Sequence, residues 1–242
     1  MRTASRRVPA SAQAPYDTVE LAGVPWPHHA VCLQANYNPD SIRLPSVSDF
    51  GWCAYANPCQ FPSCRNAQLG IICTPTCCPY SGSCGNGLEH KNYVTNVKKI
   101  GMASLCAVGT DDLDEGVVVG VYIGETQLVD SASRYLNTGY ALVMRAIPEG
   151  RGGMRVRIDA EKYGSAMRFL NRSCSPTVHL HELANGTAHS VVAITCRAVA
   201  RGEEVTVSYG DDLWFTCRCG SDACVRRHLQ HLDDSEPELD EV

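Results

Sequence analysis

The cysteines are the residues of this chain whose types and spacing point most directly to chemistry. Three of the fourteen stand close together in CRCGSDAC, at Cys217, Cys219 and Cys224. Three thiolates this close can occupy three corners of a tetrahedral zinc site, and the glycine between them permits a tight backbone. Cys174, upstream in RFLNRSCSPT, is the candidate for the fourth ligand. A disulfide with one spare thiol is the alternative.

A second group of cysteines stands in the first third of the chain. Its candidate zinc ligands are Cys53, Cys59, Cys64, Cys73, Cys77, Cys78 and Cys84. Seven thiolates suit two zinc ions if one sulfur bridges them, whereas two separate tetrahedral sites need eight ligands. Cys32 could be the eighth, so the sequence does not decide which cysteines bind which zinc ion. Cys106 and Cys196 lie inside apolar runs, which predicts buried small side chains.

The composition favours metal ligation over disulfides. No stretch combines a charged start, an apolar core and a small-residue cleavage site, so we expect no secretory signal. The longest apolar run, Val117 to Ile123, is too short to span a bilayer, and we expect no membrane contact. Dense cysteine without an oxidising compartment is typical of metal sites.

The net charge of −5 comes from the C-terminus. Six acidic side chains lie between residues 233 and 241, and the rest of the chain carries about +1. This balance predicts no strong direct binding to duplex DNA. We expect residues 231–242 to form a solvated, disordered tail, and a docking strip for a basic partner is the alternative.

Short β-branched runs bounded by glycine, aspartate or proline begin after Tyr93. They predict a mainly β fold of small sheets, with strands within 116–125, 139–147, 153–161, 190–199 and 203–210. EGRGG (149–153) and ELANGT (182–187) predict hairpin turns. DSASRYLNT (130–138) predicts a short helical insertion. Residues 1–31 contain several prolines and scattered arginine and serine, which predicts disorder.

Three motifs follow one another in the second half of the chain: MRFLNRSCSPT, RGEEVTVSYG and FTCRCGSDAC. In order and spacing they resemble the SET-domain protein lysine methyltransferases, whose pattern is R-F-[ILM]-N-H-S-C-x-P-N, then G-E-E-[LV]-T-x-x-Y, then C-x-C-G-x3-C. Upstream, VKKIGMASLCA is similar to the family's K-G-W-G-L-x-A strand, and GVYIGE to its E-Y-[VI]-G-E strand. The resemblance covers roughly residues 53 to 228.

The cysteine-rich front is similar to the AWS type of pre-SET module, with cysteine-x-asparagine steps at CRN (64–66) and CGN (84–86). Cys78 is a thiol that the usual AWS spacing lacks. The resemblance implies small curved sheets with a pseudoknot, in which the segment around Cys174 crosses the tyrosine segment. It implies a pre-SET module at 32–92, a SET domain at 93–215, a post-SET module at 216–230 and about three zinc ions.

The resemblance also implies a site for S-adenosyl-L-methionine. Tyr209 corresponds to the family's catalytic tyrosine, and Tyr140 is the second catalytic candidate, in the channel wall. Val207 and Leu142 would line the lysine channel and set the number of methyl groups. The cofactor would contact Ile100, Gly101, Met102, Gly139, Tyr140, Asn171, Arg172 and Phe215.

Four positions depart from the family pattern. Arg172 replaces a histidine, Thr177 an asparagine, Ala103 the second glycine and Met102 a tryptophan. A methyl group at Ala103, on a backbone that approaches the cofactor, could weaken cofactor binding.

The predicted function is methylation of protein lysine with S-adenosyl-L-methionine. AWS modules accompany enzymes that act on histone H3 at the lysine marking transcribed genes, which implies a histone tail or nucleosome as substrate and a place in nuclear chromatin. We expect a monomer that adds more than one methyl group. The alternatives are a methyltransferase for a non-histone protein, and a degenerate SET fold that binds chromatin and transfers nothing.

Overall fold

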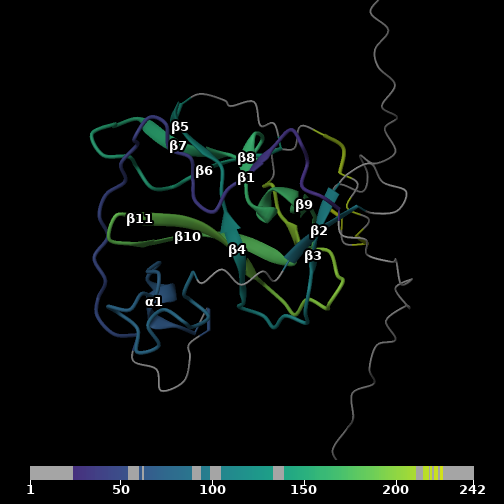
Figure 1. Ribbon diagram of the computed structural model, residues 1–242, viewed down its shortest axis with the longest axis horizontal. Helices are drawn as coiled ribbons and strands as arrows, with labels where there is room; N and C mark the ends of the chain where they lie inside the picture. The colour runs from purple at the N-terminus through teal and green to yellow at the C-terminus, as the bar shows by residue number, and fades with distance from the viewer. Residues whose placement is uncertain are drawn as a thin grey trace, which may run out of the picture.

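The computed structural model describes residues 24–53, 60–61, 63–88, 94–98, 105–132, 139–210, 215–217, 219, 221–222 and 224–225. The strands of this part of the chain form four small sheets, and the fold is mainly β, as predicted (Figure 1). None of its helices is long and apolar enough to cross a membrane.

The largest sheet has the strand order β4-β11-β10-β12-β9. Its long hairpin joins β10 (Val178–Asn185) to β11 (Ala188–Thr195) through Gly186, whose φ of 57° suits a tight turn. The hairpin prediction is confirmed, but the turn is shorter than 182–187 because β10 continues to Asn185. Nothing in the strand prediction anticipated β10.

β4 (Val118–Tyr122) forms one edge of this sheet, whereas β5 (Glu125–Asp130) belongs to another. The prediction of one strand over 116–125 is therefore wrong at its end. The chain changes sheets at Gly124, where a Cβ atom would lie 2.4 Å from the Asp159 carbonyl oxygen. A glycine is needed because the two backbones approach so closely.

The second sheet has the order β5-β7-β6, with β7 (Met154–Asp159) in the centre and β6 (Ala141–Val143) at the edge. EGRGG connects β6 and β7, which pair antiparallel, so this hairpin prediction is confirmed. β6 is shorter than the predicted 139–147. The Glu182 carboxylate accepts hydrogen bonds from the Arg145 and Ala146 backbone N–H groups, at 2.6 and 3.1 Å, so this stretch does not continue the ladder.

Two smaller sheets complete the frame. β2 (Val94–Lys98) pairs antiparallel with β3 (Leu105–Gly109), and β1 (Val31–Cys32) pairs parallel with β8 (Tyr163–Gly164). The predicted helical insertion at 130–138 lies largely outside the described residues.

The segment before the cysteine module lies against the sheets. The Trp26 ring packs edge-on against Phe169 with centroids 5.3 Å apart, and Ala30 is buried. The predicted disorder of residues 1–31 is thus wrong for 24–31, because Trp26 has an apolar partner from the distant 3-10 helix η1 (Ala166–Phe169). Further along, Tyr37 forms a β-bridge with Glu125.

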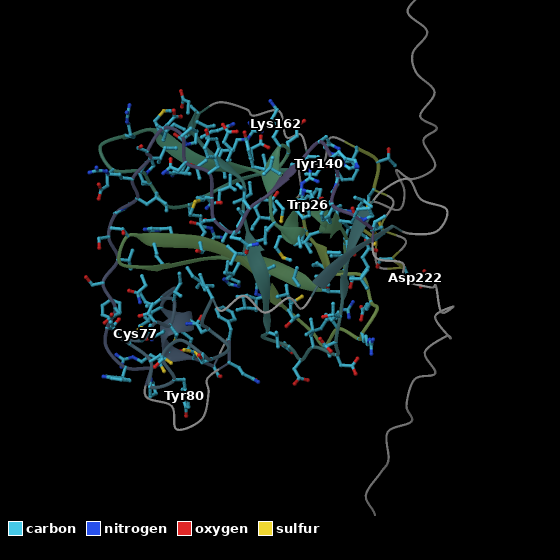
Figure 2. The ribbon with its side chains drawn as sticks, in the orientation of Figure 1. Trp26, Cys77, Tyr80, Tyr140, Lys162 and Asp222 are labelled. Carbon is cyan, nitrogen blue, oxygen red and sulfur yellow. The ribbon has the colours of Figure 1, made fainter. Side chains whose placement is uncertain are left out.

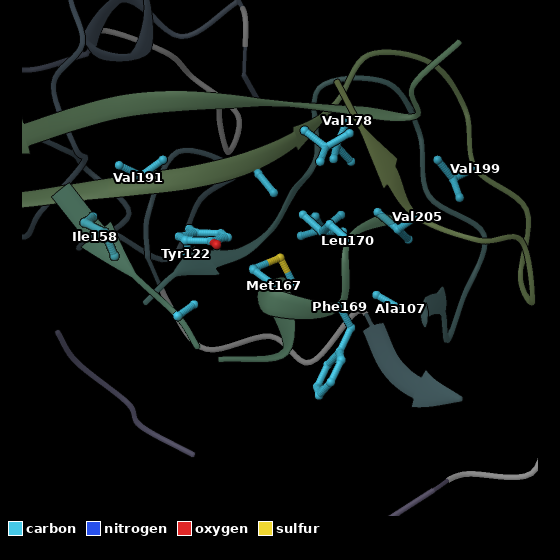
Figure 3. Packing of buried hydrophobic residues seen from close by; sticks show 14 of the residues in the cluster. Ala107, Tyr122, Ile158, Met167, Phe169, Leu170, Val178, Val191, Val199 and Val205 are labelled. Atoms are coloured by element: carbon cyan, nitrogen blue, oxygen red, sulfur yellow. The ribbon is translucent and has the colours of Figure 1, made fainter. Parts of the chain in front are cut away.

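The main core lies between the large sheet, the β5-β7-β6 sheet and η1 (Figure 3). It is built from β-branched side chains, such as Val178 and Val191, with Tyr122, Met167, Phe169 and Leu170. A second cluster lies on the opposite face of the β10-β11 hairpin, where Leu183, Val192 and Ile194 pack against Phe61 and several cysteines. The short helix α1 (Arg65–Gln68) belongs to this cysteine-rich part.

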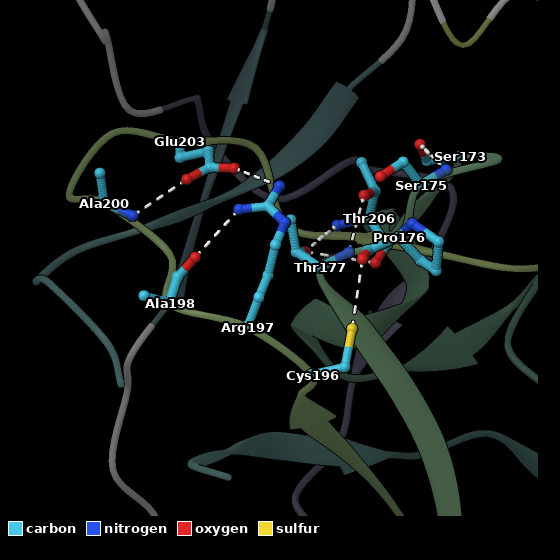
Figure 4. Close-up of polar contacts among 10 residues, drawn as sticks. All are labelled: Ser173, Ser175, Pro176, Thr177, Cys196, Arg197, Ala198, Ala200, Glu203 and Thr206. Atoms are coloured by element: carbon cyan, nitrogen blue, oxygen red, sulfur yellow. Dashed lines mark hydrogen bonds and ion pairs between the residues drawn. The ribbon is translucent and has the colours of Figure 1, made fainter. Parts of the chain in front are cut away.

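β12 (Thr206–Val207) lies between β9 (Asn171–Arg172) and β10 and runs parallel to both. The loop from Ser173 to Thr177 joins β9 to β10, so it must cross β12 to do so. Thr177 holds this crossing: its N–H donates to the Thr206 carbonyl at 3.0 Å, and the Thr206 N–H donates to the Thr177 hydroxyl at 2.8 Å (Figure 4). The crossing of the two motif segments therefore lies where the resemblance implied.

Candidate active site and metal centres

The loop that crosses β12 brings Cys174 to the C-terminal cysteines. The sulfur atoms of Cys174, Cys217, Cys219 and Cys224 all lie within 4.8 Å of one another. The Cys174, Cys217 and Cys224 sulfurs are 3.6 to 4.0 Å apart. Four sulfurs about 2.3 Å from a tetrahedral zinc ion lie about 3.8 Å apart, so these four side chains fit such an ion.

The thiols of this group titrate unequally. Burial opposes ionisation of Cys219, but N–H groups of Cys174 and Ser221 donate to its sulfur and lower its pKa to about 6. Burial raises the pKa of Cys217 to about 12. Burial also opposes ionisation of Cys174, yet its hydrogen bonds with Cys224 and with the Val225 backbone lower its pKa. The surroundings thus lower the pKa of Cys174 and Cys219 and raise that of Cys217.

Arg172 lies directly beside this group. Its Nη1 donates to the Cys217 sulfur, while its backbone pairs with Val207 in β12. Its Nε is buried and has no hydrogen-bond partner among the described residues. The residue that departs from the family histidine therefore contacts the sulfur group with its side chain.

The front cysteines form two overlapping groups, Cys53-Cys64-Cys73 and Cys73-Cys78-Cys84. The Cys64 and Cys73 sulfurs are 3.7 Å apart and the Cys78 and Cys84 sulfurs 3.8 Å apart, again the spacing around a tetrahedral zinc ion. Cys73 is common to both groups, so it is the sulfur placed to bridge two ions. Without metal, a hydrogen bond with Cys84 and burial raise the pKa of Cys73.

Two buried asparagines point at the shared sulfur. Asn66 Nδ2 lies 3.5 Å and Asn86 Nδ2 3.4 Å from Cys73 Sγ, and both donate. Each side chain is at most 1% exposed. These are the asparagines of the CRN and CGN steps, whose role the sequence did not give. Their position two residues after a cysteine was the available signal.

Cys77 lies apart from these groups. Its sulfur accepts from the Thr74 N–H at 3.4 Å and from Asn185 Nδ2 at 3.5 Å. Cys32 is exposed in β1, away from α1 (Figure 1), and belongs to none of the sulfur groups of the described residues. Cys59 lies outside the described residues. Cys106 is buried in β3, as predicted, and half-buried Cys196 donates to the Pro176 carbonyl (Figure 4).

The two cysteine regions lie at opposite ends of the molecule. Figure 2 shows Cys77 and Tyr80 of the front region at the lower left and Asp222, beside the C-terminal cysteines, at the right. Tyr140 lies in the upper part of the same view.

Tyr209 stands just after β12 and is half-buried. Its hydroxyl donates to the Leu170 carbonyl at 2.8 Å, and its ring meets Phe215 edge-on with centroids 6.2 Å apart. Burial, and secondarily the neighbouring Tyr140, raise the pKa of Tyr209 to about 12. The hydroxyl therefore remains protonated at neutral pH, and its oxygen keeps lone pairs that can accept a hydrogen bond.

Tyr140 is fixed from two sides. Its carbonyl accepts hydrogen bonds from the Tyr122 hydroxyl at 2.7 Å and from the Ala160 N–H at 2.8 Å. The Arg168 guanidinium lies over its ring, 4.7 Å from the centroid. Burial raises the pKa of Tyr122, so that hydroxyl also stays a donor. The structure brings the two predicted catalytic tyrosines into one neighbourhood.

Arg168 was missed as a site residue although it opens the RFLN motif. It is 5% exposed and donates to the Ala160 and Glu161 carbonyls, at 2.9 Å each. In the described part of the chain it has no carboxylate partner in a salt bridge. Its guanidinium is therefore a buried cation that holds the Tyr140 ring next to the backbone of Ala160 and Glu161.

The predicted cofactor contacts are placed only in part. Ile100, Gly101 and Met102, like the departure at Ala103, lie outside the described residues. Asn171 Nδ2 donates to the Leu105 carbonyl at 3.3 Å and to Glu204 Oε1 at 2.7 Å. Asn171 thus ties β9 to the start of β3, and Gly139 directly precedes Tyr140. Leu142 packs against the main core, and Val207 is buried in it.

Comparison with known proteins gives a consistent result. The family model described as SET domain matches residues 71–210. The H3 lysine-36 specific histone-lysine N-methyltransferase of Debaryomyces hansenii is 25% identical over 178 residues, covering 67% of this chain and 23% of its own. The histone-lysine N-methyltransferase ash1 of Drosophila melanogaster is 26% identical over 217 residues, covering 79% and 9%. This chain thus spans less than a quarter of either relative.

A solved structure has the same fold. The crystal structure of KRYPTONITE in complex with mCHG DNA and SAH superimposes with a TM-score of 0.59 at 18% identity. The match covers 82% of this chain and 47% of the other.

Proposed function

The chain belongs to the SET-domain family, and from this premise we propose that it is an S-adenosyl-L-methionine-dependent histone-lysine N-methyltransferase. The observation that carries the proposal is the place of Tyr209. Its hydroxyl, held by the Leu170 carbonyl beside the β9-β12 crossing, stands close to Tyr140 and Phe215. The relatives named as histone-lysine methyltransferases support it.

The reaction needs a neutral lysine amine aligned with the methyl donor, since an ammonium ion has no free pair. Lysine in water has a pKa of about 10.4, and an apolar channel lowers it because burial disfavours the charged form. The Tyr209 hydroxyl donates to Leu170, so its oxygen is oriented to accept a hydrogen bond from the amine. Tyr140 forms the opposite wall, braced by Arg168 and Tyr122.

The bound cofactor would supply the methyl group as an electrophile. We propose that Gly139, Tyr140, Asn171, Arg172 and Phe215 contact it, together with Ile100, Gly101 and Met102. Asn171 supports this role because its side chain fixes the start of β3, three residues beyond Met102.

We propose that the cysteine groups hold about three zinc ions. Two ions would occupy the front groups that share Cys73, with Cys59 and Cys77 as further candidate ligands. The third ion would be held by the C-terminal group of Cys174, Cys217, Cys219 and Cys224. The sulfur spacings support both assignments. The fold divides accordingly into a pre-SET module, a SET domain at 93–215, a post-SET module at 216–230 and an acidic tail. Because residues 33–47 lie along the sheets, we place the start of the pre-SET module near Cys53.

We propose histone H3 in chromatin as the substrate, at the lysine marking transcribed genes, and hence a nuclear location. A relative named H3 lysine-36 specific supports this choice. A non-histone substrate is the second candidate, and nothing in the described residues reads a substrate sequence.

A direct assay tests the proposal. The full chain is incubated with radiolabelled S-adenosyl-L-methionine and either nucleosomes or free histones, and the modified lysine is identified by mass spectrometry. We expect Tyr209→Phe to lower turnover at least about 100-fold, the low end for a group acting in the transition state, with cofactor affinity retained. The control is Tyr163→Phe, because that ring packs against Tyr37 in another part of the fold, with centroids 5.0 Å apart. A fully active Tyr209→Phe chain would contradict the role of the hydroxyl.

We propose further that Val207 permits more than one methyl group. Valine offers no hydrogen bond and little bulk, so a methylated amine can still rotate into line beside Leu142. Val207→Tyr should shift the product towards monomethyl-lysine. Overpacking a core position costs about 1–3 kcal/mol, and Val207 is 5% exposed, so the product ratio is compared at matched turnover. A wild-type product that remains monomethyl would exclude this role.

A further inference from the structure

The C-terminal sulfur group has a charged neighbour. Arg172 Nη1 donates to Cys217, and the guanidinium also lies near the thiols of Cys174 and Cys219. Its Nε is buried and has no partner among the described residues. A guanidinium is planar, permanently charged and less strongly hydrated than an ammonium, so it suits an anionic neighbour in a half-buried place.

The charge of the proposed zinc site explains what this cation does. Four thiolates on a divalent ion leave a net charge of −2, in a place where Cys217 is buried and Cys174 and Cys219 are half-buried. A hydrogen bond from a cation to a thiolate reduces the charge on sulfur and thereby its tendency to take up a proton or leave the metal. Such neighbours of the ligands commonly contribute 10–100-fold in metal affinity.

The backbone of Arg172 makes this contact more than a local one. It pairs with Val207, two residues before Tyr209, and the Ser173 N–H donates to the Val207 carbonyl at 3.0 Å. Arg172 therefore connects two parts of the fold. Its main chain pairs with β12, and its side chain contacts the C-terminal sulfur group.

We propose that Arg172 is a positioning residue that holds the C-terminal zinc site by neutralising its thiolates and anchors it to β12. The inference rests on the proposed zinc site, but it does not depend on methyl transfer.

The test is the rate of zinc transfer from the full chain to a chromogenic chelator, measured without cofactor or histone. Arg172→Met keeps much of the length and removes the charge and the donors, while Arg172→Lys keeps a charge without the planar fork. We expect Arg172→Met to release one zinc equivalent about 10–100-fold faster than wild type, with the front equivalents unchanged. Arg172→Lys should fall between the two. Arg201→Met, at an exposed position, is the matched control.

A second measurement keeps the inference testable if a variant folds poorly. Alkylation of individual cysteines by iodoacetamide, followed by mass spectrometry on the natively folded fraction, should be faster at Cys217 in Arg172→Met and unchanged at Cys64. Equal zinc release and equal Cys217 alkylation in wild type and Arg172→Met would overturn the proposal. A chain that releases zinc as expected but transfers no methyl would refute the proposed function alone.

Discussion

The two cysteine regions use the same ligand in opposite surroundings. In the front region the grouped sulfurs are buried, and the shared one accepts hydrogen bonds from two neutral amides, Asn66 and Asn86. In the C-terminal region Cys174 and Cys219 are half-buried, and the donor is a cation, Arg172. The front region thus resembles a small buried core, whereas the C-terminal region is a partly exposed link between two segments of the chain.

The two regions also differ in how the chain assembles them. The front ligands come from one stretch of sequence, which is attached to the sheet by local contacts. Ile71 forms a bridge with Ala184, and Asn185 Nδ2 donates to the Ile72 carbonyl at 2.9 Å. The C-terminal group joins Cys174 to cysteines that follow β12 and Tyr209 in the sequence. Loss of metal should therefore destabilise the fold in the first case and open the proposed cofactor pocket in the second.

The largest effect that follows from this comparison is expected for Cys73→Ser. Removing the shared sulfur should release two zinc equivalents together and strongly destabilise the fold, since structural zinc contributes about 10–16 kcal/mol to small zinc peptides. Metal analysis and thermal unfolding check this.

Cys32→Ser is the control for that variant, because Cys32 is exposed and belongs to no sulfur group of the described residues. If Cys32→Ser also loses zinc, Cys32 is a ligand after all. If Cys73→Ser loses one equivalent or none, the front region has no bridging sulfur.

A smaller effect on the fold is expected for Cys174→Ser. It should lose one zinc equivalent and at least about tenfold in affinity for S-adenosyl-L-methionine, because metal binding is coupled to local order. The unfolding temperature should fall by only a few degrees, as expected for about 1 kcal/mol in a chain of this size. Calorimetric titration with the cofactor measures the affinity. An unchanged value would show that the C-terminal zinc site does not support the proposed cofactor pocket.

The smallest effect on metal content and cofactor binding is expected for Asn86→Ala, because every cysteine is kept. The variant loses hydrogen bonds to Cys73 Sγ and to the Ile71 carbonyl, at 3.4 and 2.8 Å. Unsatisfied buried acceptors cost about 1–3 kcal/mol, and zinc release from the front region should be about tenfold faster. Asn38→Ala is the control, because the Asn38 side chain bonds the backbone of Ile42, away from the cysteines. Equal release rates in both variants would show that the amides do not support the metal.

The sequence predicted ligand chemistry better than ligand geometry. Cysteine spacing is enough to predict zinc, because thiolates are its preferred ligands. That Cys73 is the shared sulfur depends on how the loops around it fold in three dimensions, which spacing does not encode. Arg172 stood out as a departure, but its contact with Cys217 depends on a segment far along the chain.

The strands were predictable where β-branched residues dominate and less so where they do not. β7 and β11 follow this pattern. β10 was missed because VHLHELAN places His179, His181 and Glu182 in a strand. His181 has an apolar neighbour that no local pattern shows, because its ring packs against Phe61 with centroids 4.9 Å apart. β6 ends early because the Glu182 carboxylate, from another sheet, accepts hydrogen bonds from the backbone just beyond it, at Arg145 and Ala146.

The position of β12 between β9 and β10 has a consequence for synthesis of the chain. Both neighbours precede β12 in the sequence, so β10 presents an unpaired edge until residue 207 has left the ribosome. Pairing of parallel strands over such separations is slow, and exposed edges associate with other chains. The nascent chain is therefore most vulnerable to aggregation between the synthesis of β10 and the emergence of β12, and the central sheet closes only after that.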